Sequence, residues 1–344
     1  MSRILILRLS SLGDIVQALP LAGTLEEAGH QVSWLLEDRF AGLGPLLRAG
    51  VLPMIWKRGW RGAWKLRGQG QNRFDLALDL QGNFKSAFLG RILGLKPIFG
   101  FARNELRESL AGMFRQERLP PSSSLHMAER GWELACFALG KTLPPLSPPP
   151  HLVPTPEMEK RLRAILVEKG ISPSAPLYVL VAGALEDPRV WPLSQVLSLF
   201  SRLENPSLVL LGPREDALVL PPWVPCLRQR GSRGLEDLVA LGAHLRKTGG
   251  KAIGHDGGAM HVLHATGAST LFLFGPQDPR RTGPRGGDVL VSKDDLPCRP
   301  CLKRQCALES GPICMEGITV EQVLAFLGAP RSFPKKKDSK EGVE

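Results

Sequence analysis

The sequence predicts an α/β protein made of two parallel-sheet domains that face each other across a cleft. Apolar segments of strand length alternate with segments of helical periodicity on both sides of a proline-rich stretch, residues 144–156. This alternation is typical of parallel sheets covered by helices on both faces. The length of 344 residues also exceeds what one hydrophobic core usually supports. We therefore expect domains at 1–143 and 157–330, a linker at 144–156, and a disordered charged tail at 331–344.

The first strand and helix form the clearest unit of the chain. Ile4 to Leu9 is an apolar run, residues 10–13 form a turn, and from Asp14 onward apolar residues recur at helical spacing. Such a unit places loop residues at the carboxyl edge of a parallel sheet, where ligands bind. Asp14 is thus a candidate to face a ligand cleft. Alternatively it only caps its helix, because Asp is a favoured N-cap residue.

The other expected elements follow the same alternation. In the first domain we expect strands at 31–36 and 74–80 and helices at 39–48, 83–93 and 127–139. In the second we expect helices at 157–169, 193–203, 235–246 and 258–266, alternating with strands at 177–181, 207–211, a strand ending at Gly254, and 269–274.

Composition and charge bound the kind of protein. Hydrophobic residues make up 43% and charged residues 22%, which is ordinary for a soluble globular protein, and no apolar run approaches the ~20 residues of a membrane span. Arg8 and Asp14 interrupt the apolar N-terminus, which argues against a signal peptide, so we expect a cytoplasmic protein. The net charge of +11 favours an anionic partner.

A glycine-rich loop in the second domain is a candidate diphosphate site. The segment Gly254 to His261 lies between an expected strand and helix, with Gly257 and Gly258 at the helix entrance. Glycine lets backbone N–H groups approach phosphate, and the helix N-terminus adds partial positive charge. A ligand-free connection and a core histidine remain the alternatives. The loop at 274–279 follows the next strand and borders the same cleft.

Four motifs then occur in order: SSLGDIVQALP, LDLQGNFKSA, DGGAMHVLHATG and LFGPQDP. Together they resemble glycosyltransferase family 9, the ADP-heptose:lipopolysaccharide heptosyltransferases, from Ser2 to about Leu327. The segment PCRPCLKRQC…CMEGIT looks most like the heptosyltransferase II branch. The resemblance implies a GT-B fold with two Rossmann-like domains, the acceptor bound by the first and the nucleotide sugar by the second. It also implies metal-independent transfer with inversion at the anomeric carbon, without a cofactor.

The resemblance assigns the general base to Asp14, the acid of the SS-x-GD motif. Inverting transfer needs a base on the acceptor side of the sugar, opposite the departing diphosphate. Acceptor binding is assigned to residues of the first domain, several of them basic because the lipopolysaccharide core carries carboxylates and phosphates. These residues are Arg8, Ser10, Ser11, Gln81, Lys85 and Arg107.

Donor binding is assigned to the second domain. Hydrogen-bond donors that already point at the diphosphate lower the activation barrier, because the diphosphate gains negative charge in the transition state. The expected residues are Arg189, Glu215, Asp256, Gly257, Gly258 and His261, with Asp216 a competitor for the ribose-binding role of Glu215. Gly257 stands where the family often has Thr, and Arg189 where it often has Lys. For Arg189 and Glu215 the alternative is an ordinary surface salt bridge.

Tryptophans recur at every fourth position, Trp56, Trp60 and Trp64, at the start of a basic stretch that runs from Lys57 to Arg73. On a helix this spacing makes one aromatic stripe. Basic residues beside Trp suit an anionic membrane interface, whereas the alternative is that the tryptophans pack on the core of their own domain.

Four cysteines cluster with the spacing C-x2-C-x4-C-x7-C: Cys298, Cys301, Cys306 and Cys314. They could hold a structural zinc or cluster, or be thiols or a local disulfide. The last gap is irregular, and the segment lies away from the proposed reaction centre; that transfer uses no metal is what the resemblance implies. Cys136 and Cys226 are expected to be ordinary buried residues.

The function that these observations favour is heptose transfer from ADP-heptose to the lipopolysaccharide inner core. We expect a monomer without a nucleic-acid partner, peripheral at the inner face of the inner membrane. A GT-B enzyme with another donor or acceptor is the first alternative. A dinucleotide-dependent oxidoreductase is disfavoured because the first turn has only Gly13 in place of G-x-G-x-x-G. A nucleic-acid-binding protein is disfavoured because no helix-turn-helix, zinc-finger or RNP signature is present.

Overall fold

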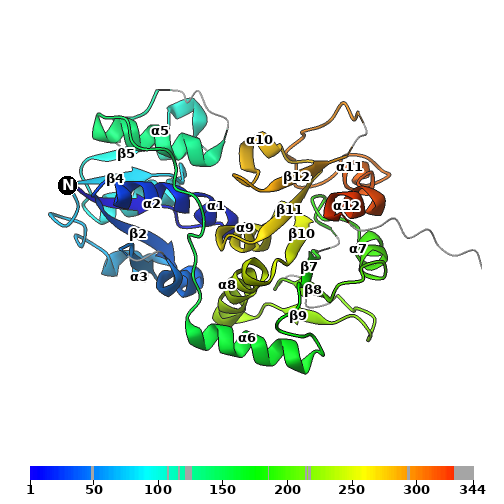
Figure 1. Cartoon of the computed structure of the whole chain (residues 1–344). Coiled ribbons are helices and arrows are strands. Elements are labelled where there is room, and N and C mark those ends of the chain that lie inside the picture. The colour runs from blue at the N-terminus through cyan, green and yellow to red at the C-terminus, as the bar shows by residue number, and fades with distance from the viewer. Residues whose placement is uncertain are drawn as a thin grey trace, which may run out of the picture.

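Two six-stranded sheets, each built from parallel strand pairs, form the framework of the protein (Figure 1). The computed structural model describes residues 1–47, 50–106, 108–114, 117–120, 126–184, 186–213, 215, 218–292 and 295–328. The α/β class and the two-sheet architecture predicted from the sequence are confirmed. The predicted tail, 331–344, lies outside the described residues.

The first sheet has the strand order β3-β2-β1-β4-β5-β6. Its strands are β1 (Arg3–Leu7), β2 (Gln31–Glu37), β3 (Leu52–Trp56), β4 (Leu76–Asp79), β5 (Ile98–Gly100) and β6 (Glu117–Arg118). The central strand β1 pairs with β2 and with β4, and its residues Ile4 to Leu7 are fully buried, as apolar runs in parallel sheets are.

The helices of this half are α1 (Leu12–Gln17), α2 (Leu19–Glu27), η1 (Asp38–Leu46), α3 (Trp60–Lys65), α4 (Phe84–Ile92), η2 (Arg103–Glu105), η3 (Ser109–Met113) and α5 (Met127–Leu139). The single helix expected from Asp14 is wrong: it divides at Ala18, and Pro20 lies in the first turn of α2, where a missing N–H costs little. The expected α-helix at 39–48 is instead the 3₁₀-helix η1, which contains Pro45.

The tryptophan stripe is also corrected by the structure. Trp56 ends strand β3 and is buried, so only Trp60 and Trp64 share helix α3. The side chains of Trp60 and Trp64 are 75% and 60% exposed, respectively, so they do not pack in the core. Trp56 does pack in the core, as the alternative expected. A strand at 52–56 was not expected, because Pro53 argues against a central strand, yet β3 is an edge strand and tolerates it.

The proline-rich stretch runs from α5 to α6 (Pro156–Glu168) and is fixed to both halves. The Ser147 N–H donates to Thr24 Oγ1 of α2 at 2.9 Å, and the His151 N–H donates to the Ala265 carbonyl at 2.7 Å. The segment therefore holds the halves together in addition to connecting them. The exact domain boundaries stay a prediction.

The second sheet has the order β12-β11-β10-β7-β8-β9. Its strands are β7 (Tyr178–Val181), β8 (Ser207–Leu211), β9 (Cys226–Arg228), β10 (Lys251–His255), β11 (Ser269–Phe274) and β12 (Asp288–Val291). The helices are α7 (Leu193–Phe200), α8 (Gly231–Thr248), α9 (Gly258–Ala265), α10 (Pro279–Thr282), α11 (Ile313–Glu316) and α12 (Val320–Leu327).

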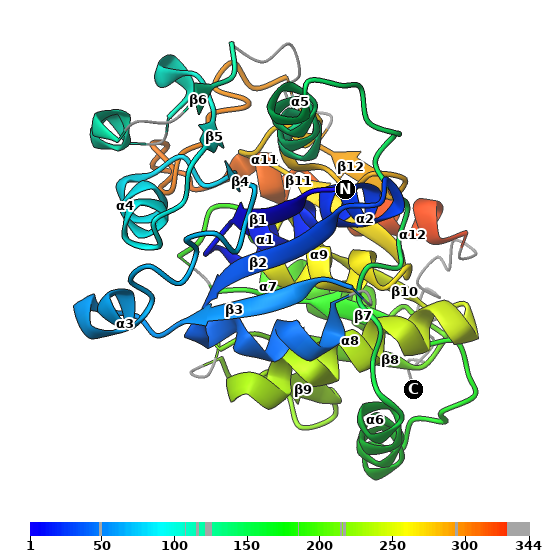
Figure 2. The same ribbon diagram turned by 90° about the vertical axis from the view of Figure 1, so that its left-hand side faces the viewer.

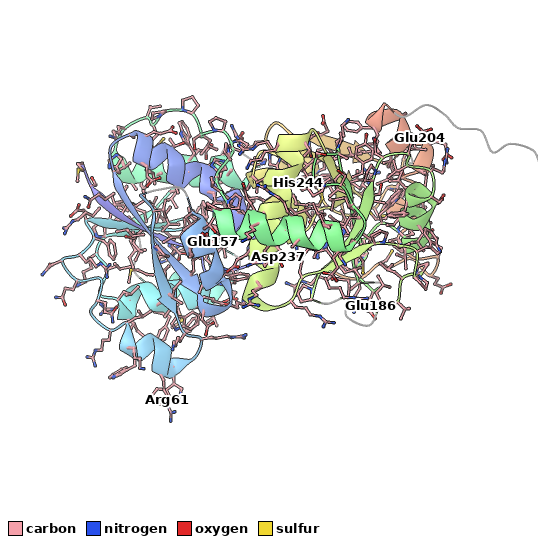
Figure 3. All side chains as sticks on the ribbon, turned by 60° about the horizontal axis from the view of Figure 1, so that its bottom comes forward. Arg61, Glu157, Glu186, Glu204, Asp237 and His244 are labelled. Carbon is pink, nitrogen blue, oxygen red and sulfur yellow. The ribbon has the colours of Figure 1, made fainter. Side chains whose placement is uncertain are left out.

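Helices α1 and α9 lie between the two sheets and pack against each other (Figure 1). The largest apolar core continues through this contact, from Ile15 and Val16 of α1 to Met260 and Val262 of α9. On the underside, α6, which begins beside Glu157, packs on α8, which carries Asp237 (Figure 3). Arg161 of α6 pairs with Asp237 there. No helix in the described part of the chain has the length and hydropathy needed to cross a bilayer.

Candidate functional site

The N-termini of α1 and α9 meet where the carboxyl edges of the two sheets face each other. A Cβ added to Gly13 would lie 3.2 Å from His261 Cδ2 and 3.6 Å from Gly258 Cα. A Cβ added to Gly258 would lie 3.2 Å from the side chain of Leu12. Glycine at both positions therefore lets the two helix N-termini approach closely. The SSLGD turn and the glycine-rich turn, 245 positions apart at Gly13 and Gly258, share one seam.

Asp14 lies at this seam, one turn inside α1. Ser11 is the N-cap and Asp14 occupies the N3 position of a capping box, so Asp14 does cap its helix, from N3 and not as the N-cap residue. Asp14 Oδ2 accepts from the Ser11 N–H at 3.2 Å and from the Ser11 hydroxyl at 3.1 Å. Its Oδ1 forms an ion pair with Arg8 at 2.9 Å, and the carboxylate side chain is 15% exposed. The carboxylate is therefore oriented by three donors and still reachable.

Arg8 and Gln81 support the turn from beneath. Arg8 is 2% exposed and donates to the Leu80 carbonyl as well as pairing with Asp14. Gln81 is buried, and its Oε1 accepts from the Leu9 N–H at 3.0 Å and the Ser10 N–H at 3.4 Å. Ser10 is half-buried and Ser11 is exposed.

Lys85, in the first turn of α4, pairs with the buried Glu37 at 2.5 Å and lies 5.7 Å from the centroid of the Trp56 ring. Its side chain is 36% exposed, so it is within reach of solvent at the edge of the first sheet. The sixth expected acceptor residue, Arg107, lies outside the described residues.

A connected group of polar side chains lies on the other side of the seam. Asp256 follows β10, and its Oδ1 is 2.8 Å from His261 Nε2, while its Oδ2 accepts from the Thr282 hydroxyl at 2.9 Å. Burial would raise the pKa of Asp256, but the hydrogen bonds and charges of His261, Thr282 and Arg189 hold it below its usual range.

Arg189 is oriented toward this group by an acidic neighbour. Its guanidinium forms a bidentate pair with Asp187, at 2.9 Å from Nε to Oδ1 and 2.5 Å from Nη2 to Oδ2. Its Nη1 lies 3.4 Å from the Asp256 carbonyl oxygen. The hydrogen bonds to Asp187 raise the pKa of Arg189, so the cation is secure.

His255 ends β10 beside the same charges. The residue is half-buried, but its Nδ1 is fully buried and makes no hydrogen bond within the described part of the chain. Burial, and then the positive charge of Arg189, lower the pKa of His255 to about 4. The ring is therefore neutral at physiological pH.

The other residues expected to bind the sugar donor follow strands of the second sheet. Gly257 is the N-cap of α9 in an extended conformation, and Gly258 is the first residue of the helix. Glu215 follows β8, and its carboxylate lies against Gly212, where an added Cβ would come within 2.5 Å of Oε2. Asp216, its expected competitor, lies outside the described residues.

Gln17 also lies at the seam and was not selected from the sequence. It lies one turn after Asp14 on α1, and its Nε2 is 3.1 Å from His261 Nε2 and 3.5 Å from the Thr282 carbonyl oxygen. It is a polar residue at i+3 from Asp14 within an apolar helix, a signal that would have placed it on the same face. Gln17 also lines both a cavity of about 220 Å³ bounded by His261 and a small cavity of about 20 Å³ bounded by Asp14.

The four clustered cysteines are all free thiols and surround one small cavity near α11. The disulfide alternative is therefore wrong. Among the described residues, no group of three or more His, Cys, Asp or Glu side chains is arranged to hold a metal ion. Cys136 and Cys226 are half-buried, not fully buried as expected.

Two parallel sheets facing across a seam, with an oriented carboxylate on one side and a glycine-rich helix N-terminus on the other, are the architecture of a two-domain Rossmann-like protein that binds ligands at the carboxyl edges of its strands. The family model of glycosyltransferase family 9 (heptosyltransferase) matches residues 64–311. The chain belongs to glycosyltransferase family 9.

Curated relatives agree with this membership. The chain is 30% identical over 332 residues to lipopolysaccharide heptosyltransferase 1 of Pseudomonas aeruginosa, covering 89% of this chain and 88% of the relative. It is 25% identical over 310 residues to the protein of the same name from Salmonella typhimurium, with coverages of 84% and 93%. The branch assignment to heptosyltransferase II stays a prediction.

Solved structures share the fold along nearly the whole chain. A glycosyl transferase of family 9 from Veillonella parvula has a TM-score of 0.72 at 18% identity, covering 94% of this chain and 95% of that one. The E. coli heptosyltransferase WaaC with ADP has a TM-score of 0.68 at 21% identity, with coverages of 95% and 99%. E. coli ADP-heptose lps heptosyltransferase II has a TM-score of 0.67 at 20% identity, with coverages of 95% and 98%.

Proposed function

We propose that this enzyme transfers heptose from ADP-heptose to the inner core of lipopolysaccharide, with inversion at the anomeric carbon. The observation that carries the proposal is the contact of Gly13 with His261 and Gly258, which puts the Asp14 turn and the glycine-rich turn at one seam. The curated relatives named lipopolysaccharide heptosyltransferase 1 support the choice of donor sugar and acceptor.

Asp14 is proposed as the general base. Its carboxylate takes the proton of the acceptor hydroxyl as that oxygen forms its bond to the anomeric carbon. The pair with Arg8 and the two bonds from Ser11 hold the carboxylate in place before substrate arrives. Because the base belongs to the first half and the leaving group to the second, attack comes from the face opposite the diphosphate, which inverts the configuration.

The departing ADP is proposed to be stabilised by fixed positive charge in place of a metal ion. Arg189 supplies a guanidinium already oriented by Asp187, and the N–H groups of Gly257 and Gly258 supply the positive end of α9. Asp256 and His261 hold the shape of this turn through their 2.8 Å contact. Glu215, at the end of β8, is proposed to bind the ribose hydroxyls.

The acceptor is proposed to bind the first half, which we take as the acceptor domain. Ser10, Ser11 and Lys85 are the polar groups available at its edge, and Arg8 and Gln81 position the turn that carries the base. Because this acceptor is a lipid, we place the enzyme at the inner face of the inner membrane, acting as a monomer.

Mass spectrometry of a reaction with ADP-heptose and a truncated core acceptor tests the proposal. The expected product is heavier than the acceptor by one heptose residue and accompanies an equal amount of ADP. Product formed from another nucleotide sugar, with none from ADP-heptose, would instead establish the alternative of a GT-B enzyme with a different donor.

A further inference from the structure

Helix α3 carries an apolar pair on its outer side as well as on its inner side. Ala63 and Leu66 face inward and pack in the core cluster that includes Leu89 of α4. Trp60 and Trp64, one turn apart, face outward and are 75% and 60% exposed. Two large exposed indoles side by side are unusual on a protein surface that meets only water.

The chain segment that carries these tryptophans is basic. Residues 57–73 include six basic residues and no acidic one. All six basic residues are exposed: Lys57, Arg58, Arg61, Lys65, Arg67 and Arg73. No ion pair among the described residues involves them. Arg61 extends from α3 away from the body of the molecule (Figure 3), and the guanidinium carbons of Arg61 and Arg67 lie 5.3 and 4.6 Å from the rings of Trp60 and Trp64.

The apolar character continues onto the neighbouring elements. Helix α4 exposes Phe84 and Phe88, stacked with centroids 5.9 Å apart, and η3, which packs on α4, exposes Leu110 and Met113. Figure 2 shows α3, α4 and the β5–β6 region along one side of the molecule. We call this side, formed by α3, α4 and η3, the docking face.

We propose that the docking face binds the surface of an anionic lipid bilayer, with Trp60 and Trp64 inserted at headgroup depth. The unpaired basic side chains match the charge of anionic headgroups, and indole rings prefer the boundary between headgroups and acyl chains. A nucleic acid would match the charge but would leave the exposed Phe88, Leu110 and Met113 without a role.

This inference deepens the proposed function, because a lipid acceptor is reached from the membrane surface. The first turn of α4 also carries Lys85, which is one of the proposed acceptor residues. Docking through this face would bring the edge of the first sheet toward the headgroups. The binding itself needs neither donor nor acceptor, so it can be tested separately from transfer.

Flotation of the full-length protein with vesicles tests the proposal. Wild type should float with vesicles rich in phosphatidylglycerol, remain in solution with pure phosphatidylcholine, and be released as salt rises. Trp60→Ala combined with Trp64→Ala should weaken partitioning about tenfold or more. Arg61→Gln combined with Arg67→Gln should weaken it about tenfold or more while keeping both rings.

Matched variants on the second half provide the controls. Trp223→Ala removes an indole that is 59% exposed, and Lys160→Gln combined with Arg163→Gln removes two exposed charges from α6. Both should partition like wild type. Undiminished flotation of the Trp60 and Trp64 double variant overturns the proposal, as does binding of wild type to a DNA duplex but not to anionic vesicles. The Trp60→Ala, Trp64→Ala double variant should transfer heptose to a soluble, deacylated acceptor at the wild-type rate.

Discussion

Gln17 of α1 lies 3.1 Å from His261 of α9, side chain to side chain, and so links the two halves of the enzyme at the point where they meet. The same Gln17 amide lies 3.5 Å from the Thr282 carbonyl oxygen. His261 in turn contacts Asp256. A continuous polar connection therefore runs from the helix of the proposed base to the turn proposed to hold the diphosphate.

Gln17→Ala should lower kcat about fivefold to tenfold, because it removes the 3.1 Å polar contact that links α1 to His261 of α9. Steady-state kinetics with both substrates measures the effect. Gln195→Ala is a matched control, since the Gln195 side chain donates to the Glu316 carbonyl at 2.8 Å on an exposed surface of the second half. A kcat equal to that of wild type for Gln17→Ala would show that the contact is not needed for alignment.

Asp14→Asn should lower transfer at least about a hundredfold, because an amide cannot accept the acceptor proton. The substitution preserves the size of the side chain and its bonds from Ser11, so the helix should stay folded. Calorimetric titration should give an ADP affinity close to that of wild type. Transfer at a rate near that of wild type would remove Asp14 from the role of base.

Arg189→Ala should weaken ADP binding about tenfold or more, because a charge-assisted hydrogen bond to the diphosphate is lost. Arg189→Lys should bind better than Arg189→Ala, since it keeps the charge without the bidentate geometry. Arg202→Ala removes an arginine that pairs with Glu321 on the second half, and it should leave ADP affinity unchanged. The role of Arg189 is contradicted if the two alanine variants bind ADP equally well.

Transfer should continue at an undiminished rate in excess EDTA, because the proposal assigns the charge on the departing diphosphate to Arg189 and to the N-terminus of α9. The measurement is product formation by enzyme dialysed against the chelator. Restoration of a lost activity by added Mg²⁺ or Mn²⁺ would place a metal ion at the diphosphate.

Stability should fall as pH drops from 6.5 toward 4, partly through His255. Its pKa is lowered to about 4 in the folded state, so in this range the unfolded chain takes up a proton that the folded protein does not. The stabilisation is complete above the unfolded pKa, and about 2 to 3 kcal/mol is lost by pH 4.5. Urea unfolding of wild type and of His255→Gln at several pH values should show a shallower pH dependence in the variant. Parallel curves would mean that His255 titrates normally.

The sequence predicted most interior strands and missed the four edge strands and the short interior strand β5. Residues 207–211 and 269–274 are strands as expected, because continuous apolar runs between glycines or prolines have few other uses. The edge strands β3, β6, β9 and β12 were missed, since short, partly exposed pairs carry little periodicity.

At the candidate site, the sequence identified residues but not their partners. Asp14, Asp256 and His261 were selected by their motifs, whereas the contacts of Gln17 with His261 and of Thr282 with Asp256 depend on how distant segments pack. Arg8 and Gln81, which were expected to bind the acceptor, are both buried under the turn. Sequence periodicity cannot show whether a polar side chain is buried under a turn or faces the cleft, because that depends on the tertiary packing.

The absence of side chains at positions 13 and 258 sets the spacing of the whole enzyme. One added methyl group at either position would meet an atom 3.2 Å away across the seam. The neighbouring side chains would have to move by a few tenths of an ångström, while every charged group of both half-sites would stay intact. A substitution at either position therefore alters the separation of the two half-sites without altering the chemistry of either.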